Sequence, residues 1–186
     1  MPKPQGDTKA QILAIARDLF ARQGYRGTSI ADIARELGTT PAALYYHYGS
    51  KAELLDALLA EPLAAYAELA AQARSGRLSA EELLGAFIDF TADTRRLMPV
   101  VSSDPAVRAR LDDRLPHTPA EMAETIIAAL AASPGESGGH AERLIEARAS
   151  YAAAKEGTIA ALDLGNGALC PDHRKLVLTT ALRALG

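Results

Sequence analysis

Side chains suited to binding phosphate are concentrated near the start of the 186-residue chain. Thr28 and Ser29 stand where one short helix is expected to begin, and Lys51 follows Ser50 where another is expected to begin. Helix N-termini carry unpaired amides and a partial positive charge, which attract anions. The hydroxyls and the lysine at these two positions therefore predict a phosphate-binding surface.

Lys51 carries the strongest part of this signal. In the first turn of a helix the dipole disfavours a cation, so stability alone does not explain a lysine there. A phosphate bound by both the helix amides and the ammonium group would explain the lysine at this position. The alternatives are that Lys51 is an exposed lysine without a role, and that Thr28 and Ser29 only cap helices.

A catalytic or metal-binding site is not predicted. The sequence holds no GxSxG, P-loop, HExxH or glycine-rich dinucleotide motif. Its single cysteine, Cys170, excludes an internal disulfide framework and a cysteine metal cluster. The four histidines show no metal-ligand spacing; they are His47, His117, His140 and His173. We therefore expect no enzymatic activity, no metal and no cofactor.

Charge and hydropathy limit the class of protein further. The net charge is −3. Residues 1–51 hold seven basic and four acidic side chains, so this segment carries a charge of +3 and the remaining residues carry −6. This asymmetry suggests a nucleic-acid-facing end on an acidic body. No uncharged run is long enough to span a bilayer, and no signal peptide is recognisable. We expect a cytoplasmic protein without a membrane partner.

The elements that position these residues are predicted to be helices throughout. Alanine and leucine recur at helical spacing, and strand-like alternation is absent. Capping signals indicate helix starts at Ser29, Thr40, Ser50, Ser79 and Thr118. Pro62 should kink or break the fourth helix. The expected helices cover about 8–23, 29–37, 40–48, 50–74, 79–97, 104–113, 118–132, 141–164 and 172–185.

The second and third helices form the informative pair. Gly38 stands in the short turn between them, and small Ala34 allows close packing. This is a helix-turn-helix arrangement, whose second helix can enter the major groove of DNA. The pattern also occurs in unrelated folds, so by itself it leaves other functions open.

The residues themselves closely resemble the tetracycline-repressor (TetR) family. The resemblance runs over about residues 9–58, through GYRGTSIADIAREL (24–37), Gly38 and TTPAALYYHYGSKAELL (39–55). Tyr48 departs from the commoner phenylalanine but keeps the aromatic character. The resemblance implies an all-α protein with a three-helix DNA-binding domain (1–51) followed by a helical effector-binding and dimerisation domain (52–186). It implies a regulator that binds double-stranded operator DNA.

The DNA-contacting residues follow from both arguments. Small residues at the exposed start of the third helix would face the bases, with hydrogen bonding from one threonine and methyl contacts from the alanines. Direct base reading would then be sparse, and DNA shape would contribute. Leu44 and Tyr48 are expected to be core. The predicted set is Thr28, Ser29, Thr40, Ala42, Ala43, Tyr45, Tyr46, His47 and Lys51.

The remaining helices are expected to dimerise and to bind an unidentified small-molecule effector. A dimer matches a palindromic operator, and the last two helices are the natural interface, through Ala147, Ala154, Leu162, Leu176 and Thr180. The pocket candidates, each of which is also a plausible plain core residue, are Phe87, Phe90, Thr91, Met98, Met122, Ile126 and Tyr151. The prediction is a dimeric repressor released by its effector. The alternatives are an activator, or a ligand-binding or interaction protein without operator binding.

Overall fold

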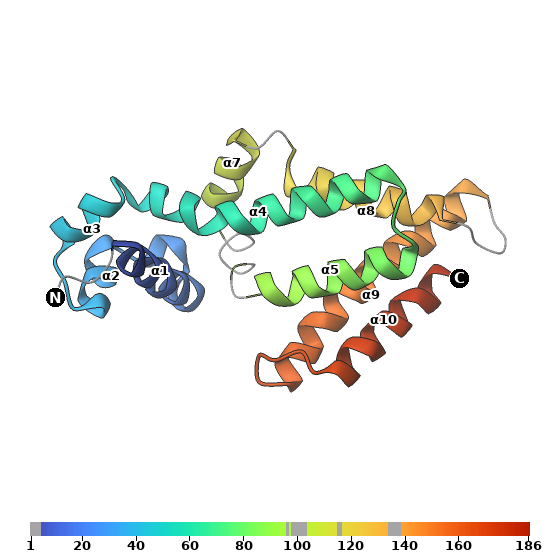
Figure 1. Ribbon diagram of the computed structural model, residues 1–186. Helices are drawn as coiled ribbons and strands as arrows, with labels where there is room; N and C mark the ends of the chain where they lie inside the picture. Colours follow the sequence, from blue (N-terminus) through green and yellow to red (C-terminus); the bar gives the residue numbers. More distant parts are fainter. Residues whose placement is uncertain (1–4, 96, 98–103, 115–116, 134–138) are drawn as a thin grey trace. The chain divides into compact units, whose positions relative to one another are not determined.

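The computed structural model describes residues 5–95, 97, 104–114, 117–133 and 139–186. All regular structure in these residues is α-helical (Figure 1), as the sequence predicts. The chain divides into two compact units. Unit 1 comprises residues 1–63 and 96–114, and unit 2 comprises residues 64–95 and 115–186.

Unit 1 contains the predicted helix-turn-helix. Its helices are α1 (Gln5–Gly27), α2 (Ile30–Leu37), α3 (Pro41–His47), the first part of α4 (Lys51–Ser75) and α7 (Pro105–Arg114). Large apolar side chains from every one of these helices are fully buried, among them Ile12, Phe20, Ile33, Leu44, Leu54, Leu55 and Val107.

Local signals fix the ends of α2 and α3. Ser29 accepts a hydrogen bond from the Asp32 amide, and the Asp32 carboxylate accepts one from the Ser29 amide, which completes a capping box. Gly38 ends α2 in the left-handed conformation, at φ 72°. Thr40 caps α3, and Pro41 occupies its first turn, where no amide is needed. The turn thus holds α3 directly after α2.

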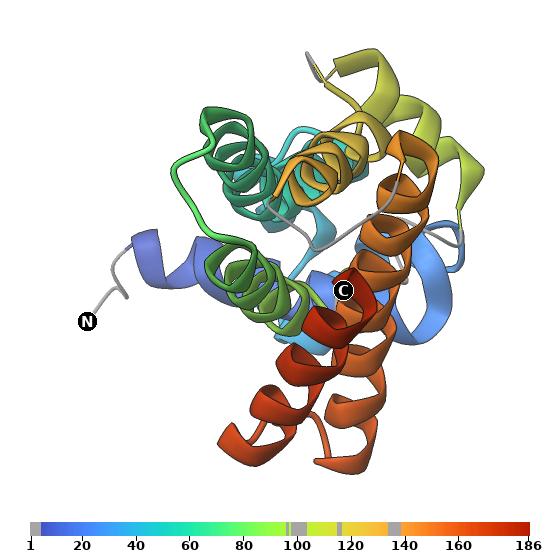
Figure 2. The same cartoon turned by 90° about the vertical axis from the view of Figure 1, so that its right-hand side faces the viewer.

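Unit 2 is a bundle around α9 (His140–Leu164). This helix packs against α5 (Ala80–Thr94), α8 (Pro119–Ala132) and α10 (Pro171–Leu185), and α10 also packs against α5. Figure 2 shows α9 and α10 side by side. The capping boxes predicted at Ser79 and Thr118 are both formed. Phe87, Ile88, Ile126 and Leu130 lie in the buried centre of this bundle.

The structure adds two observations on domain limits and on Pro62. The expected domain boundary at residues 51 and 52 falls within unit 1, and α7 clusters with the helix-turn-helix although it follows α5 in sequence. Pro62 lies inside α4, which continues to Ser75, so the helix is not broken there. A proline removes one backbone hydrogen bond, and the neighbouring turns keep theirs.

Three residues predicted at the dimer surface are in fact buried within the protomer. Ala147, Ala154 and Leu162 are at most 2% exposed, because they face the other helices of unit 2. They therefore have no surface to offer to a partner. Leu176 and Thr180 are exposed and remain predictions. None of the described helices is long and apolar enough to cross a membrane.

Candidate nucleic-acid interface

A cleft of about 500 Å³ opens at the N-terminus of α2. Backbone of the α1–α2 connection and side chains from α3 and α4 surround it. Its lining residues are Arg26, Gly27, Thr28, Ser29, Ile30, Ala31, Pro41, Tyr45 and Lys51. Four of the nine predicted DNA-contacting residues thus meet around one cleft: Thr28, Ser29, Tyr45 and Lys51.

Thr28 closes the end of α1. It is 1% exposed, and its hydroxyl donates to the Gly24 carbonyl at 2.9 Å. Gly24, at φ 76°, interrupts the helix, and Thr28 satisfies one of the carbonyls left there. The Thr28 hydroxyl therefore has a structural partner within the domain, and the residue contributes to the cleft chiefly through its backbone.

Lys51 is also held by the end of α1. Its ammonium donates to the carbonyls of Tyr25 and Thr28, each at 2.9 Å, and lies 4.3 Å from the centre of the Tyr25 ring. Cations stabilise helix C-termini by binding such carbonyls. This contact explains a lysine in the first turn of α4 without a bound anion. One of its three N–H groups remains for a phosphate at the cleft.

The aromatic residues of α3 divide into core and surface. Leu44 is buried, and Tyr48 is half-buried with a pKa raised by that burial. Tyr45 and Tyr46 are 53% and 77% exposed. Exposed tyrosines on a short helix offer hydroxyl donors and flat surfaces to a partner. Thr40 and Ala42 are exposed, and Ala43 and His47 are partly exposed.

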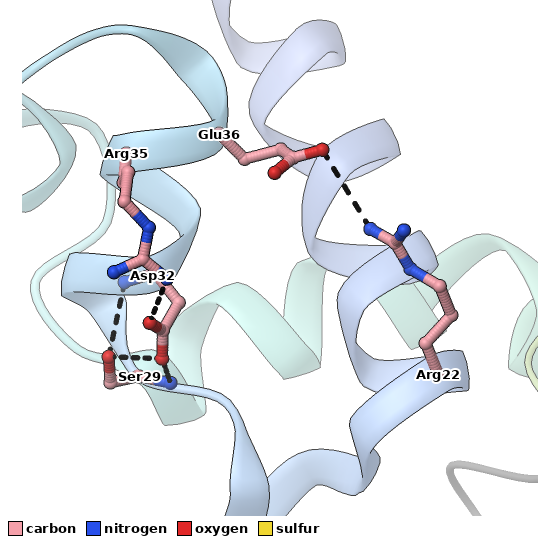
Figure 3. A network of polar contacts seen from close by, with 5 residues as sticks. All are labelled: Arg22, Ser29, Asp32, Arg35 and Glu36. Atoms are coloured by element: carbon pink, nitrogen blue, oxygen red, sulfur yellow. Dashed lines mark hydrogen bonds and ion pairs between the residues drawn. The ribbon is translucent and has the colours of Figure 1, made fainter.

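The arginines of α1 and α2 are largely paired with acids (Figure 3). Arg22 lies 3.8 Å from Glu36, and Arg35 lies 2.5 Å from Asp32. Hydrogen bonds from the Ser29 side chain and amide, and then from Arg35, lower the pKa of Asp32 to about 2. These pairs reduce the positive charge that the surface presents.

Arg26 was missed by the sequence reasoning. It lines the cleft and is exposed, but its position after the helix-breaking Gly24 carries no recognisable signal for binding. Only the fold brings this side chain to the same cleft as Tyr45. Of the two lysines that precede Arg17, Lys3 lies outside the described residues, and the Lys9 ammonium lies 5.9 Å from the centre of the Tyr48 ring.

Unit 2 brings together four aromatic rings in the region predicted to bind an effector. Phe87 stacks on Tyr151 at 4.3 Å, and Phe90 stacks on Tyr66 at 4.8 Å. The hydroxyls of Tyr66 and Tyr151 lie 2.9 Å apart. Burial raises the pKa of both phenols, so both stay protonated at neutral pH.

The other pocket candidates lie in the packed interior of unit 2. Met122 and Ile126 are buried, and the buried Thr91 donates its hydroxyl to the Phe87 carbonyl. Met98 lies outside the described residues. In the described part of the chain, no three histidine, cysteine or acidic side chains are grouped to hold a metal ion.

Comparison with known proteins identifies the helix-turn-helix. The model of the tetR family of bacterial regulatory proteins matches residues 12–58. The transcriptional regulator TtgR of Pseudomonas putida is 45% identical over 53 residues, which are 28% of this chain and 25% of that protein. The repressor KstR2 of Rhodococcus jostii is 32% identical over 93 residues, 45% of this chain and 46% of that protein. The matched segments therefore span less than half of these relatives.

The likeness in fold extends over nearly the whole chain. A protein from Saccharomonospora viridis, solved in complex with choline, superposes with a TM-score of 0.62 at 24% identity. The match covers 96% of this chain and 97% of that one. At this identity the likeness establishes the fold alone.

Proposed function

Since the chain belongs, through residues 12–58, to the tetR family of bacterial regulatory proteins, we propose that it is a homodimeric repressor of transcription. The family comprises DNA-binding regulators rather than enzymes. In this proposal the protein works in the cytoplasm, binds a palindromic operator and is released by a small-molecule effector.

The observation that carries DNA binding is the exposed face of α3 beside the cleft. Tyr45 and Tyr46 are large aromatic residues left in solvent, and Tyr45 lines the cleft at the N-terminus of α2. Such a surface suits a phosphate backbone, with a hydroxyl and amides as donors. Thr40 and Ala42, at the exposed start of α3, would then face the bases.

The aromatic cluster of unit 2 supports an effector site. Two facing phenols share one hydrogen bond, so one hydroxyl hydrogen is left to donate to a ligand or to water. Stacked rings around them suit a flat or cationic apolar molecule. A protein of similar fold was solved with choline. An effector that favours the conformation with lower operator affinity would release the DNA.

A second candidate is a ligand-binding protein of the same fold without a specific operator. The paired arginines favour it, because Arg22 and Arg35 are partly neutralised by acids. The exposed tyrosines of α3 favour operator binding instead, because burial in the domain does not require them.

The test is a mobility-shift titration with duplex DNA from the region flanking the protein's own gene. Wild type should bind specifically, more tightly at low salt. Tyr45→Phe removes one hydroxyl that would donate to phosphate, and a hydrogen bond to a charged group contributes about 1.5–3 kcal/mol. Affinity should fall roughly tenfold or more. Arg77→Ala, an exposed site outside the cleft, should change nothing.

Weak binding that ignores sequence and is equal in Tyr45→Phe would contradict the proposed repressor and favour the second candidate. The effector is tested on the protein–DNA complex that forms when wild type binds specifically. Small molecules that raise the melting temperature of the protein are added to this complex. In a repressor of the proposed kind, such a ligand lowers operator affinity, since binding and release are linked.

A further inference from the structure

Arg26 forms an ion pair with an acid from outside the helix-turn-helix. Its Nε lies 3.4 Å from Oδ1 of Asp104. The Arg26 side chain is 75% exposed, whereas Asp104 is only 5% exposed. An exposed arginine is thus paired with a carboxylate that solvent barely reaches.

Asp104 is fixed in place by α7. Its backbone carbonyl accepts hydrogen bonds from the amides of Val107 and Arg108, each at 3.1 Å, at the start of that helix. Val107 and Leu111 are buried. The Arg110 guanidinium donates two hydrogen bonds to the carboxylate of Asp56 on α4, at 2.8 and 2.6 Å. The carboxylate that meets Arg26 is therefore part of a docked element.

The contact leaves most of the guanidinium available. Among the described residues Arg26 has no further partner, so its two terminal nitrogens keep their donors while the side chain lines the cleft. A guanidinium is a planar fork that can bind a carboxylate on one edge and a phosphate on another. A tether on the Nε edge reduces the side-chain freedom that phosphate binding would otherwise cost.

We propose that Asp104 is a positioning residue, which holds Arg26 at the cleft so that its terminal nitrogens bind a DNA phosphate. The proposal rests on the proposed function of DNA binding. It extends the DNA-binding site to a residue that lies well beyond the matched segment 12–58. It also gives α7 a role in DNA affinity that the helix-turn-helix pattern does not contain.

Two effects of Asp104 on affinity oppose each other. Its negative charge repels phosphate, while its contact orients Arg26. The repulsion does not depend on the arginine, and the orientation does. A double-mutant cycle on Arg26→Gln and Asp104→Asn therefore separates them. The probe is the flanking-DNA duplex of the mobility-shift titration, with a random-sequence duplex beside it.

Arg26→Gln should weaken binding to both duplexes and reduce the salt slope by about one. Asp104→Asn alone should weaken binding about twofold to fivefold, in the range of an exposed ion pair. The double variant Arg26→Gln with Asp104→Asn should bind with the same affinity as Arg26→Gln alone, or slightly more tightly. Tighter binding by Asp104→Asn alone, or the same effect in both backgrounds, would overturn the positioning role.

A second variant keeps the test decisive if Asp104→Asn does not fold. Arg26→Lys retains the charge but loses the fork, so affinity should drop about threefold to fivefold. Arg77→Lys, at an exposed arginine outside the cleft, is the matched control and should bind as wild type. Equal affinity of Arg26→Lys and wild type would overturn the inference. Wild type that fails to bind specifically would instead overturn the proposed function.

Discussion

At the scale of single residues, the surface of α1 and α2 is organised by acids that hold other groups. Asp32 illustrates this, because its carboxylate accepts hydrogen bonds from the amide and hydroxyl of Ser29 and also binds Arg35. It occupies donors at the N-terminus of α2 that an anion could otherwise use. A phosphate in the cleft must therefore bind the remaining donors, which include Arg26 and Tyr45.

The lowered pKa of Asp32 predicts an acid-sensitive helix start. Because its folded pKa is about 2 against an ordinary 3.8, the ionised carboxylate stabilises the fold above pH 3.8. That contribution is lost as pH falls from 3.8 through about 2. The difference in unfolding free energy between wild type and Asp32→Asn should be constant above this window and shrink within it.

Urea unfolding followed by circular dichroism across this pH range measures the difference. Asp93→Asn is the control, because Asp93 is exposed and has no partner in the described part of the chain. The difference in unfolding free energy between Asp93→Asn and wild type should not shrink between pH 3.8 and about 2. A constant difference for Asp32→Asn down to the lowest pH would contradict the assigned role of the charge.

At the scale of elements, local signals were readable in the sequence and tertiary contacts were not. The caps at Ser29, Thr40, Ser79 and Thr118 depend on neighbours within three residues, so they were predicted correctly. The sequence predicts a phosphate contact for Lys51, which stays a prediction, but it does not predict that the ammonium group also binds carbonyls more than twenty residues earlier in the chain. No periodicity within α7 predicts that it joins unit 1, since its partners Asp56 and Arg26 come from distant segments.

The turn between α2 and α3 depends on one backbone conformation. Gly38 has φ 72°, and a Cβ there would meet nothing within 4 Å, so the cost of a side chain is conformational alone. Gly38→Ala should lower the unfolding free energy by about 1–2 kcal/mol, and Gly38→Asn by less. Denaturant titration of the full chain measures both.

Gly27 provides the matched control for this prediction. Its φ lies outside the left-handed region, and an added Cβ would make only an ordinary contact with Gln23, at 3.7 Å. Gly27→Ala should therefore be nearly neutral or slightly stabilising. If Gly38→Ala were as harmless as Gly27→Ala, the left-handed cap would not be what holds α3 in place.

At the scale of the whole molecule, large apolar side chains are exposed on helices of both units. In the described residues, the large exposed hydrophobic side chains are Tyr45 and Tyr46 on α3, and Ile145, Leu164 and Leu176 on α9 and α10. Isolated apolar residues are common on protein surfaces, but clustering on particular helices indicates partners. The residues of α3 are proposed to meet DNA, and Leu176 on α10 is proposed to meet a second copy of the chain.

The dimer can be tested on α10. Leu176, 63% exposed, and Thr180 stand four residues apart, so they share one face of the helix. Leu176→Arg with Thr180→Arg would bring like charges together across a symmetric interface, where each copy presents the same patch. Light scattering after gel filtration should then report a monomer, whereas wild type is expected to have the mass of a dimer. Affinity for a palindromic duplex should fall, because two half-sites are no longer bound by one particle.

Ala67→Arg adds a comparable charge at an exposed position of α4, and it should leave both mass and affinity unchanged. Circular dichroism establishes that the α10 variant remains folded, which is expected because neither substituted side chain is buried. A folded α10 variant that keeps the mass of the wild-type dimer would remove this face from the interface. Since Ala147, Ala154 and Leu162 are already committed to the protomer's own core, the search would then turn to the exposed residues of α9, beginning with Ile145 and Leu164.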